Sequence, residues 1–224
     1  MLARESLPAQ VFRHLVGGIL SGRYAPGEKL PPQRALAAEL GVNMASVREG
    51  VKRLEQANLV ETRHGDGMRV TDWRAAGGLD VLVHAVADGA ALDAGVIAEV
   101  FEARRLLLAE SAALAARRRS AEHAALLRAL AEQLAATGDD AAAQGLDLAF
   151  MATVIEAARN LAFSLIANSI RDVYLQRAEL FRAIVERRDE LDYAGVAEAI
   201  AAGESERARE RMRALAEAQE ARLR

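Results

Sequence analysis

The stretch LPPQRALAAELGVNMASVREGVKRL, residues 30–54, holds two short helical segments on either side of a glycine. The pair Pro31-Pro32 suits the first turn of a helix, because a backbone N–H at that position would find no partner within the helix in any case. The helix that this pair opens is expected to run to Leu40 and to end at Gly41. Two helices around a short turn that contains glycine are typical of a helix-turn-helix.

The second of these helices is expected to begin at Asn43 or Ser46, since either side chain suits a helix N-cap, and to run to about Ala57. Asn58 then suits the left-handed conformation that often ends a helix. The inward-facing apolar residues of this helix follow helical spacing: Val47, Val51 and Leu54.

The flanking segments predict a winged form of the motif. A preceding helix is expected over residues 7–21, where apolar residues again follow helical spacing. Residues 59–63 and 68–71 alternate apolar and polar side chains on either side of the turn at residues 64–67, a pattern that indicates a β-hairpin. A helix-turn-helix followed by such a hairpin is a common DNA-binding arrangement.

The helix over residues 43–57 is the expected reader of DNA, because the N-terminal residues of the second helix of this motif contact base edges. Arg48 and Lys52 lie four residues apart and therefore share one face of that helix. Taken singly, each of these cations is better explained as a solvated surface charge, and it is their combination with the hairpin and the basic charge balance that favours DNA binding. Other side chains near the motif that can reach phosphates are Arg34, Arg53, His64 and Arg69.

Charge divides the chain in the same way. The 224 residues have a formal net charge of −3, which by itself argues against a nucleic-acid partner. Residues 1–74 carry 11 basic and 8 acidic residues, a net charge of +3, whereas residues 75–224 carry 18 and 24, a net charge of −6. We predict a DNA-binding domain over residues 1–74, a linker over residues 75–78 and a helical domain over residues 79–224.

Residues 7–71 closely resemble the GntR family of bacterial transcription regulators. The segments that carry the resemblance are residues 30–37, 40–43, 47–49, 52–54, 59–60 and 64–67. By this resemblance, the family's DNA-contact positions fall on Arg34, Asn43, Ser46, Arg48, His64 and Gly65. Met44 departs from the family, which often has arginine there. Because a thioether cannot donate hydrogen bonds to guanine, we expect a different operator sequence or affinity.

The remainder of the chain is predicted to be helical throughout, so the fold class is mostly α. Helices are expected from residue 79 to 87, 93 to 118, 120 to 136, 139 or 140 to 159, 160 to 188, 191 to 202 and 204 to 224. This part resembles the FadR-type subfamily, whose effector domain, the FCD domain, is an antiparallel helical bundle. The supporting segments are residues 102–107, 114–116, 147–150, 159–161 and 199–203.

Many members of this subfamily bind a metal through an aspartate and three histidines, and the resemblance places that aspartate on Asp147. The histidine positions fall on Met151, Tyr193 and Leu215, none of which replaces an imidazole well. We therefore expect no metal site and no cofactor. A metal-dependent sensor of a small carboxylate remains the alternative.

An apolar cavity with few polar groups suits a small organic ligand, such as a fatty acyl group, an acyl-CoA or another organic acid. Arg104 would hold a carboxylate or phosphate, Tyr193 would donate a hydrogen bond, and Asp147 would orient a hydroxyl or pair with an arginine. Met151 and Leu215 would line the apolar part of the same site. An equally good interpretation is that Met151, Tyr193 and Leu215 only fill the core.

Together these features predict a ligand-responsive repressor that binds a palindromic double-stranded DNA operator as a homodimer. The absence of cysteine excludes disulfides, cysteine-bound zinc and a thiol nucleophile, and no glycine-rich phosphate loop follows a strand, so no enzyme is expected. No apolar run is long and uncharged enough for a signal peptide or a membrane span, which predicts a cytoplasmic protein. A helical interaction protein without a regulatory role is a further alternative.

Overall fold

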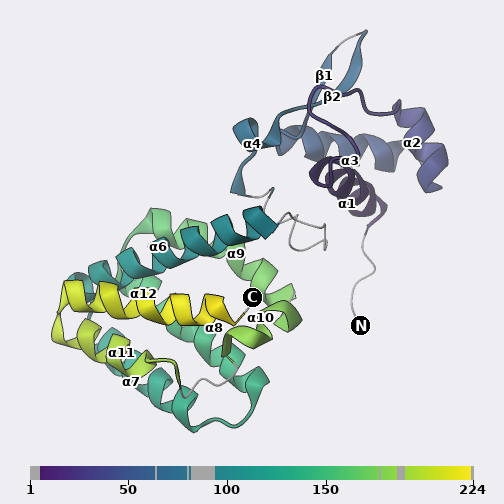
Figure 1. Ribbon diagram of the computed structural model, residues 1–224. Helices are drawn as coiled ribbons and strands as arrows, with labels where there is room; N and C mark the ends of the chain where they lie inside the picture. The colour runs from purple at the N-terminus through teal and green to yellow at the C-terminus, as the bar shows by residue number, and fades with distance from the viewer. Residues whose placement is uncertain are drawn as a thin grey trace. The chain divides into compact units, whose positions relative to one another are not determined.

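The computed structural model describes residues 6–63, 65–79, 81, 94–176, 178–185 and 190–222 (Figure 1). The chain divides into two compact units, Met1–Asp93 and Ala94–Arg224. Each unit has a hydrophobic core of its own, and the two are described separately below. None of the helices in these residues is long and apolar enough to cross a lipid bilayer.

The first unit is a winged helix-turn-helix, as predicted. Its elements are α1 (Leu7–Leu20), α2 (Gln33–Leu40), α3 (Met44–Gln56), β1 (Val60–Arg63), β2 (Gly67–Val70) and α4 (Trp73–Ala76). The two strands are antiparallel and pair Val60 with Val70 and Arg63 with Gly67. α1 and α2 both pack against α3, and the hairpin follows α3 directly (Figure 1).

Local chemistry explains where these helices end. Gly41 follows α2 with a φ of 64°, and Asn58 lies just beyond the C-cap residue of α3 with a φ of 55°. Both are left-handed conformations that glycine and asparagine adopt at low cost. The apolar side of α3 packs against α1 in the core. Fully buried members of that core include Leu15, Leu36, Val47, Leu54 and Leu59.

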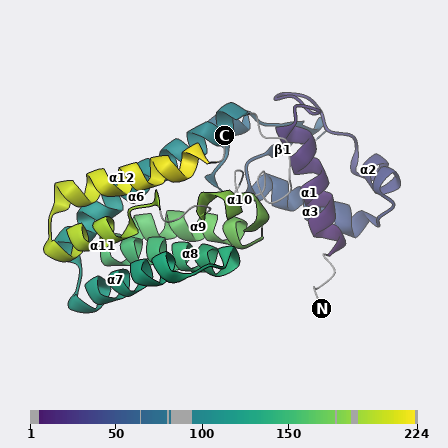
Figure 2. The ribbon, with the colours of Figure 1, turned by 60° about the horizontal axis from the view of Figure 1, so that its bottom comes forward.

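The second unit is a bundle of helices. They are α6 (Ala94–Arg118), α7 (Ala121–Ala136), α8 (Asp140–Ala157), α9 (Leu161–Gln176), α10 (Ala178–Val185), α11 (Tyr193–Ala202) and α12 (Ser205–Ala221). α12 packs along α6 and α7 packs along α8, as both views show (Figures 1 and 2). The mostly α fold class is therefore confirmed.

Caps explain the helix starts in this bundle. The Ser120 hydroxyl accepts the His123 backbone N–H while the His123 ring accepts the Ser120 N–H, a reciprocal capping box at the start of α7. Asp139 caps α8 and Asp192 caps α11. α11 consequently begins at Tyr193 rather than at residue 191, where the sequence predicted it.

Some predicted features differ from the structure or fall outside it. Within the linker predicted over residues 75–78, Ala75 and Ala76 form the end of α4. Val81, 1% exposed, packs in the core of the first unit. The predicted domain limits stay a prediction. Most of the helix expected over residues 79–87 lies outside the described residues. The helix expected over residues 160–188 is divided into α9 and α10.

Candidate functional site

The start of α3 is built around the side chain of Asn43. Its Oδ1 accepts a hydrogen bond of 2.8 Å from the backbone N–H of Ser46, which satisfies one of the unpaired donors at the helix N-terminus. This hydrogen bond uses Oδ1 of the Asn43 side chain, so the Nδ2 group of the same side chain remains available to donate to a ligand. Ser46 itself is buried, with 6% of its surface exposed.

The outer face of α3 carries the cations that the sequence predicted. Arg48 and Lys52 are exposed, as is Arg34 on α2. No ion pair joins any of these three to another residue in the described ranges. Arg48 and Lys52 are suited to phosphate and base contacts, because no carboxylate of the described residues competes for them. Met44 begins the helix with 38% of its surface exposed.

Two other predicted contact residues have different surroundings. Arg53 lies 3.8 Å from the carboxylate of Glu49, one turn earlier on α3, and is therefore partly neutralised. Gly65 is exposed in the hairpin turn with a φ of 78°, a conformation that favours glycine. His64 lies outside the described residues.

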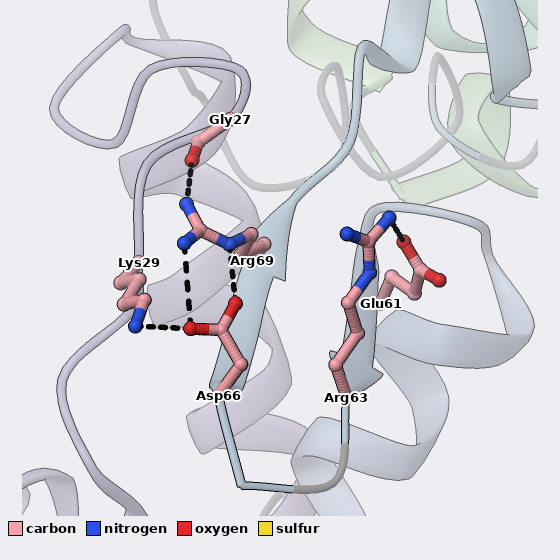
Figure 3. Close-up of polar contacts among 6 residues, drawn as sticks. All are labelled: Gly27, Lys29, Glu61, Arg63, Asp66 and Arg69. Carbon is pink, nitrogen blue, oxygen red and sulfur yellow. Dashed lines mark hydrogen bonds and ion pairs between the residues drawn. The ribbon is translucent and has the colours of Figure 1, made fainter.

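Arg69, which was expected to reach phosphate, is held within the hairpin (Figure 3). Its Nε donates to Asp66 at 2.7 Å, and one terminal nitrogen donates to the carbonyl of Gly27 at 2.9 Å. Lys29 forms an ion pair with the same carboxylate. Hydrogen bonds from Arg69 and then Lys29 lower the pKa of Asp66 to about 2. In the free chain the Arg69 guanidinium therefore has partners within the protein, and its contact with phosphate stays a prediction.

A buried polar network lies in the bundle. The Tyr193 hydroxyl donates to Asp147 Oδ1 at 2.7 Å, and Gln219 Nε2 donates to the same oxygen at 2.8 Å. Arg104 donates to Gln219 Oε1 at 2.7 Å. The three members Asp147, Tyr193 and Gln219 are 1%, 3% and 0% exposed. Burial, and then the Asp147 carboxylate, raise the pKa of Tyr193 well above its ordinary value, so the phenol remains a donor.

A cavity of about 380 Å³ opens beside this network, between α6, α8 and α9. Three of the predicted effector residues line it, namely Arg104, Asp147 and Met151. Tyr193 does not line this cavity but donates a hydrogen bond to Asp147, which does. Its ring packs edge-on against that of Phe150, with 5.2 Å between the ring centroids. Leu215 is 2% exposed and belongs to the core, which is the simpler of the two roles considered for it.

Comparison with known proteins gives this arrangement its context. The family model for bacterial regulatory proteins of the gntR family matches residues 7–70, and the FCD domain model matches residues 99–218. The chain is 37% identical over 173 residues to the HTH-type transcriptional regulator Mce2R of Mycobacterium tuberculosis, a match that covers 77% of this chain and 72% of that one. The chain belongs to the GntR family.

Other relatives agree with this assignment. The Uxu operon transcriptional regulator of Escherichia coli is 34% identical over 145 residues, 63% of this chain and 54% of that one. A solved structure described as that of Lar, which controls the Listeria monocytogenes agr system, has the same fold with a TM-score of 0.60, 18% identity, and coverage of 98% of this chain and 97% of that one. This GntR-family protein is a DNA-binding transcription regulator with a ligand-sensing FCD domain, and not an enzyme.

The metal site that the FCD resemblance implies does not fit the residues of this GntR-family regulator. Asp147 Oδ1, the candidate ligand oxygen, accepts hydrogen bonds from Tyr193 and Gln219. Met151 and Leu215 supply no nitrogen or oxygen donor at the remaining positions. Across the described ranges, no group of three or more histidine, aspartate or glutamate side chains is arranged to hold a metal ion.

Sequence reasoning missed one member of this regulator's buried polar network and several residues of its cavity. Gln219 was not singled out, although it follows Met212, Leu215 and Ala216 at the spacing of the buried face of α12. A polar residue on an apolar face was the available signal. Residues of α9 also line the cavity and were not expected there: Ser164, Ala167, Asn168 and Arg171.

Proposed function

We propose that this GntR-family regulator is a homodimeric repressor that binds a palindromic operator through α3 and releases it when a small organic acid enters the cavity of its bundle. Two copies would place their α3 helices in successive major grooves, the arrangement that a two-fold operator requires. The observation that supports operator binding is the exposed α3 face, on which Arg48 and Lys52 have no described carboxylate partner.

The lining of the cavity supports an anionic, partly apolar effector. Arg104 comes from α6 and Arg171 from α9, so cations approach the cavity from two helices. Two carboxylates, Asp147 and Glu156, also line the cavity. Asp147 accepts hydrogen bonds from Tyr193 and Gln219, which disperse part of its charge. Leu107, Leu108 and Ile155 are among the residues that supply an apolar wall. A volume of about 380 Å³ lies near the lower end of the range typical of ligand pockets, about 300–1,000 Å³.

This volume favours a small organic acid or a short acyl chain over an entire acyl-CoA. The carboxylate would bind Arg104, whose guanidinium has further N–H donors beyond the one that contacts Gln219. Met151 would contact the apolar part of the ligand, while Tyr193 would act through Asp147. Effector binding would shift the dimer toward a form with lower DNA affinity, which requires only that the ligand bind that form more tightly.

A mobility-shift experiment tests both parts of the proposal. The full-length protein is incubated with its own promoter region, and a panel of organic acids is added to the retarded complex. We expect a salt-sensitive shift that one class of acid reverses. If no promoter fragment is retarded at low salt, operator binding is refuted for those fragments. If retardation occurs but no acid reverses it, only the effector assignment fails.

Variants then assign the effector contact. Arg104→Gln should abolish release by the acid while leaving the retarded complex intact. Arg117→Gln is the matched control, because Arg117 also lies on α6 but donates to Ser205 and does not line the cavity. Equal release from both variants would contradict the assignment of Arg104. Light scattering of the free protein and of the complex tests the homodimer.

A further inference from the structure

The hairpin turn of the first unit contains two glycines, which give its backbone unusual conformational freedom. Gly65 and Gly67 both have positive φ angles, 78° and 90°. Asp66 lies between them, and its backbone N–H donates to the Arg63 carbonyl at 3.1 Å. Glycines have the greatest backbone freedom of all residues, so a turn flanked by two of them needs side-chain contacts to hold one shape.

Asp66 supplies such contacts to two other segments (Figure 3). Its carboxylate accepts from Arg69 on β2 and pairs with Lys29 in the segment before α2. Arg69 also reaches the Gly27 carbonyl, at 2.9 Å. The backbone joins the same segments, because the Leu30 N–H donates to the Met68 carbonyl at 2.9 Å. We call Lys29, Asp66 and Arg69 the wing clamp.

The wing clamp also changes which cations can meet DNA. Lys29 and Arg69 share one carboxylate, whereas Arg48 and Lys52 on α3 have no described partner. Each cation that meets a phosphate raises affinity for every DNA sequence alike, because phosphate contacts carry no direct sequence information. Holding Lys29 and Arg69 on the Asp66 carboxylate therefore limits the sequence-independent part of binding.

We propose that Asp66 is a positioning residue that raises the selectivity of DNA binding, because it holds the hairpin turn at Gly65 in one shape and keeps Lys29 and Arg69 off the phosphates. This inference rests on the proposed binding of an operator. It extends that function by assigning a role in selectivity to an acidic residue on a DNA-binding surface.

The test measures affinity for two duplexes over a range of salt concentrations. One is the duplex that the wild-type protein selects from a random pool, and the other is a shuffled duplex of equal length and composition. Asp66→Asn should weaken binding to the selected duplex by about five-fold, the scale of an exposed ion pair. It should also strengthen binding to the shuffled duplex, with a plot of log affinity against log salt steeper by up to about 0.9 for each released cation.

Glu61→Gln is the matched control. Glu61 pairs with Arg63 at 2.9 Å on the same hairpin, and this pair does not reach the segment before α2 (Figure 3). It should leave the ratio of the two affinities close to that of the wild type. Asp66→Glu keeps the charge and should restore part of the ratio.

Outcomes separate this inference from the proposed function. If the wild-type protein selects no duplex, operator binding fails. If it selects one and Asp66→Asn retains both the affinity ratio and the salt slope, the role of Asp66 is refuted. If Asp66→Asn weakens both duplexes equally with an unchanged slope, Asp66 is only structural and the inference is again overturned. Should Asp66→Asn lower the melting temperature, Lys29→Gln, which retains the Asp66–Arg69 pair, must still lower the ratio.

Discussion

Tyr193 stabilises a carboxylate that is almost completely removed from water. Asp147 is 1% exposed, and the Tyr193 hydroxyl is one of the two donors to its Oδ1. Tyr193→Phe should lower the free energy of unfolding by about 1–3 kcal/mol, the cost of leaving a buried polar group short of a partner. Denaturant unfolding followed by circular dichroism measures this change.

The control for Tyr193→Phe is Met151→Leu, a replacement of similar volume beside the same cavity. Such a change in a core usually costs less than about 1.5 kcal/mol. A Tyr193→Phe protein as stable as the wild type would show that the hydroxyl contributes nothing to the fold.

Met44 begins α3 and presents a thioether at the end of the helix that meets base edges. Met44→Arg should move the preferred sequence toward guanine at one position in each half-site. A good bidentate contact from arginine discriminates by about 1–3 kcal/mol. Selection of duplexes from a random pool by each protein measures this preference, and Met44→Leu should retain that of the wild type. Identical preferences for Met44→Arg and the wild type would place Met44 outside the base-reading surface.

The pKa of Asp66 gives the wing clamp a defined dependence on pH. Its ordinary value is 3.8, and hydrogen bonds from Arg69 and then Lys29 lower it to about 2. A lowered pKa means that the stabilisation is complete above pH 3.8 and is lost as pH falls through about 2. We expect the Asp66 carboxyl signal in a nuclear magnetic resonance titration to have its midpoint near pH 2. Arg69→Gln should raise that midpoint toward 3.8, and a wild-type midpoint already near 3.8 would contradict the clamp.

At the scale of the element, variants can separate the capping role of Asn43 at the start of α3 from the DNA contact that the family resemblance implies for it. Asn43→Ala removes the acceptor for the Ser46 N–H and should cost about 1 kcal/mol of stability. Asn43→Ser keeps a capping oxygen but lacks the amide donor. If the amide contacts DNA, as the family resemblance implies, Asn43→Ala should also weaken DNA binding. Asn43→Ser should then restore stability without restoring DNA affinity.

Thermal unfolding and mobility shifts of the same protein samples separate these two effects. Ser120→Ala provides the comparison, since it removes a cap from α7 in the other unit and should leave DNA affinity unchanged. If Asn43→Ser binds DNA as tightly as the wild type, Asn43 is a structural cap alone.

Helix ends were predictable because they depend on neighbouring residues. The left-handed positions at Gly41, Asn58 and Gly203 lie where the sequence predicted helix ends or boundaries. The Asp147 network could not be predicted in the same way, because Asp147 and Gln219 are 72 positions apart and Arg104 and Gln219 are 115 apart. A single sequence shows which residues are polar, but only the packing of α12 along α6 brings these together.

Arg69 illustrates the same limit within one small domain. Its positive charge beside the hairpin suggested a phosphate contact, because sequence reveals the charge of a side chain but not its partner. The structure pairs it with Asp66, which the sequence placed in the turn without assigning it a role.

On the scale of the whole molecule, the net charge of −3 conceals an uneven distribution. Residues 1–74, which include the α3 cations, have a net charge of +3, whereas residues 75–224 have a net charge of −6. An acidic bundle repels the DNA backbone, so it favours docking through the first unit. Arg104 and Arg171 line the bundle cavity together with Asp147 and Glu156, so this part of an acidic domain offers cations to the organic acid that we propose.

In the complete protein, removal of metal should consequently have no effect, whereas addition of an organic acid should stabilise the fold. Dialysis against a chelator should leave both the melting temperature and the operator affinity unchanged, because the residues at Asp147 do not form a metal site. A bound organic acid at about a hundred times its dissociation constant should stabilise the folded protein by about 2.7 kcal/mol. Thermal unfolding of chelated protein, with zinc or with each acid added back, makes the comparison. Stabilisation by zinc that Asp147→Asn abolishes would show that a metal displaces the Tyr193 and Gln219 hydrogen bonds, and would replace the organic-acid site with a metal-dependent one.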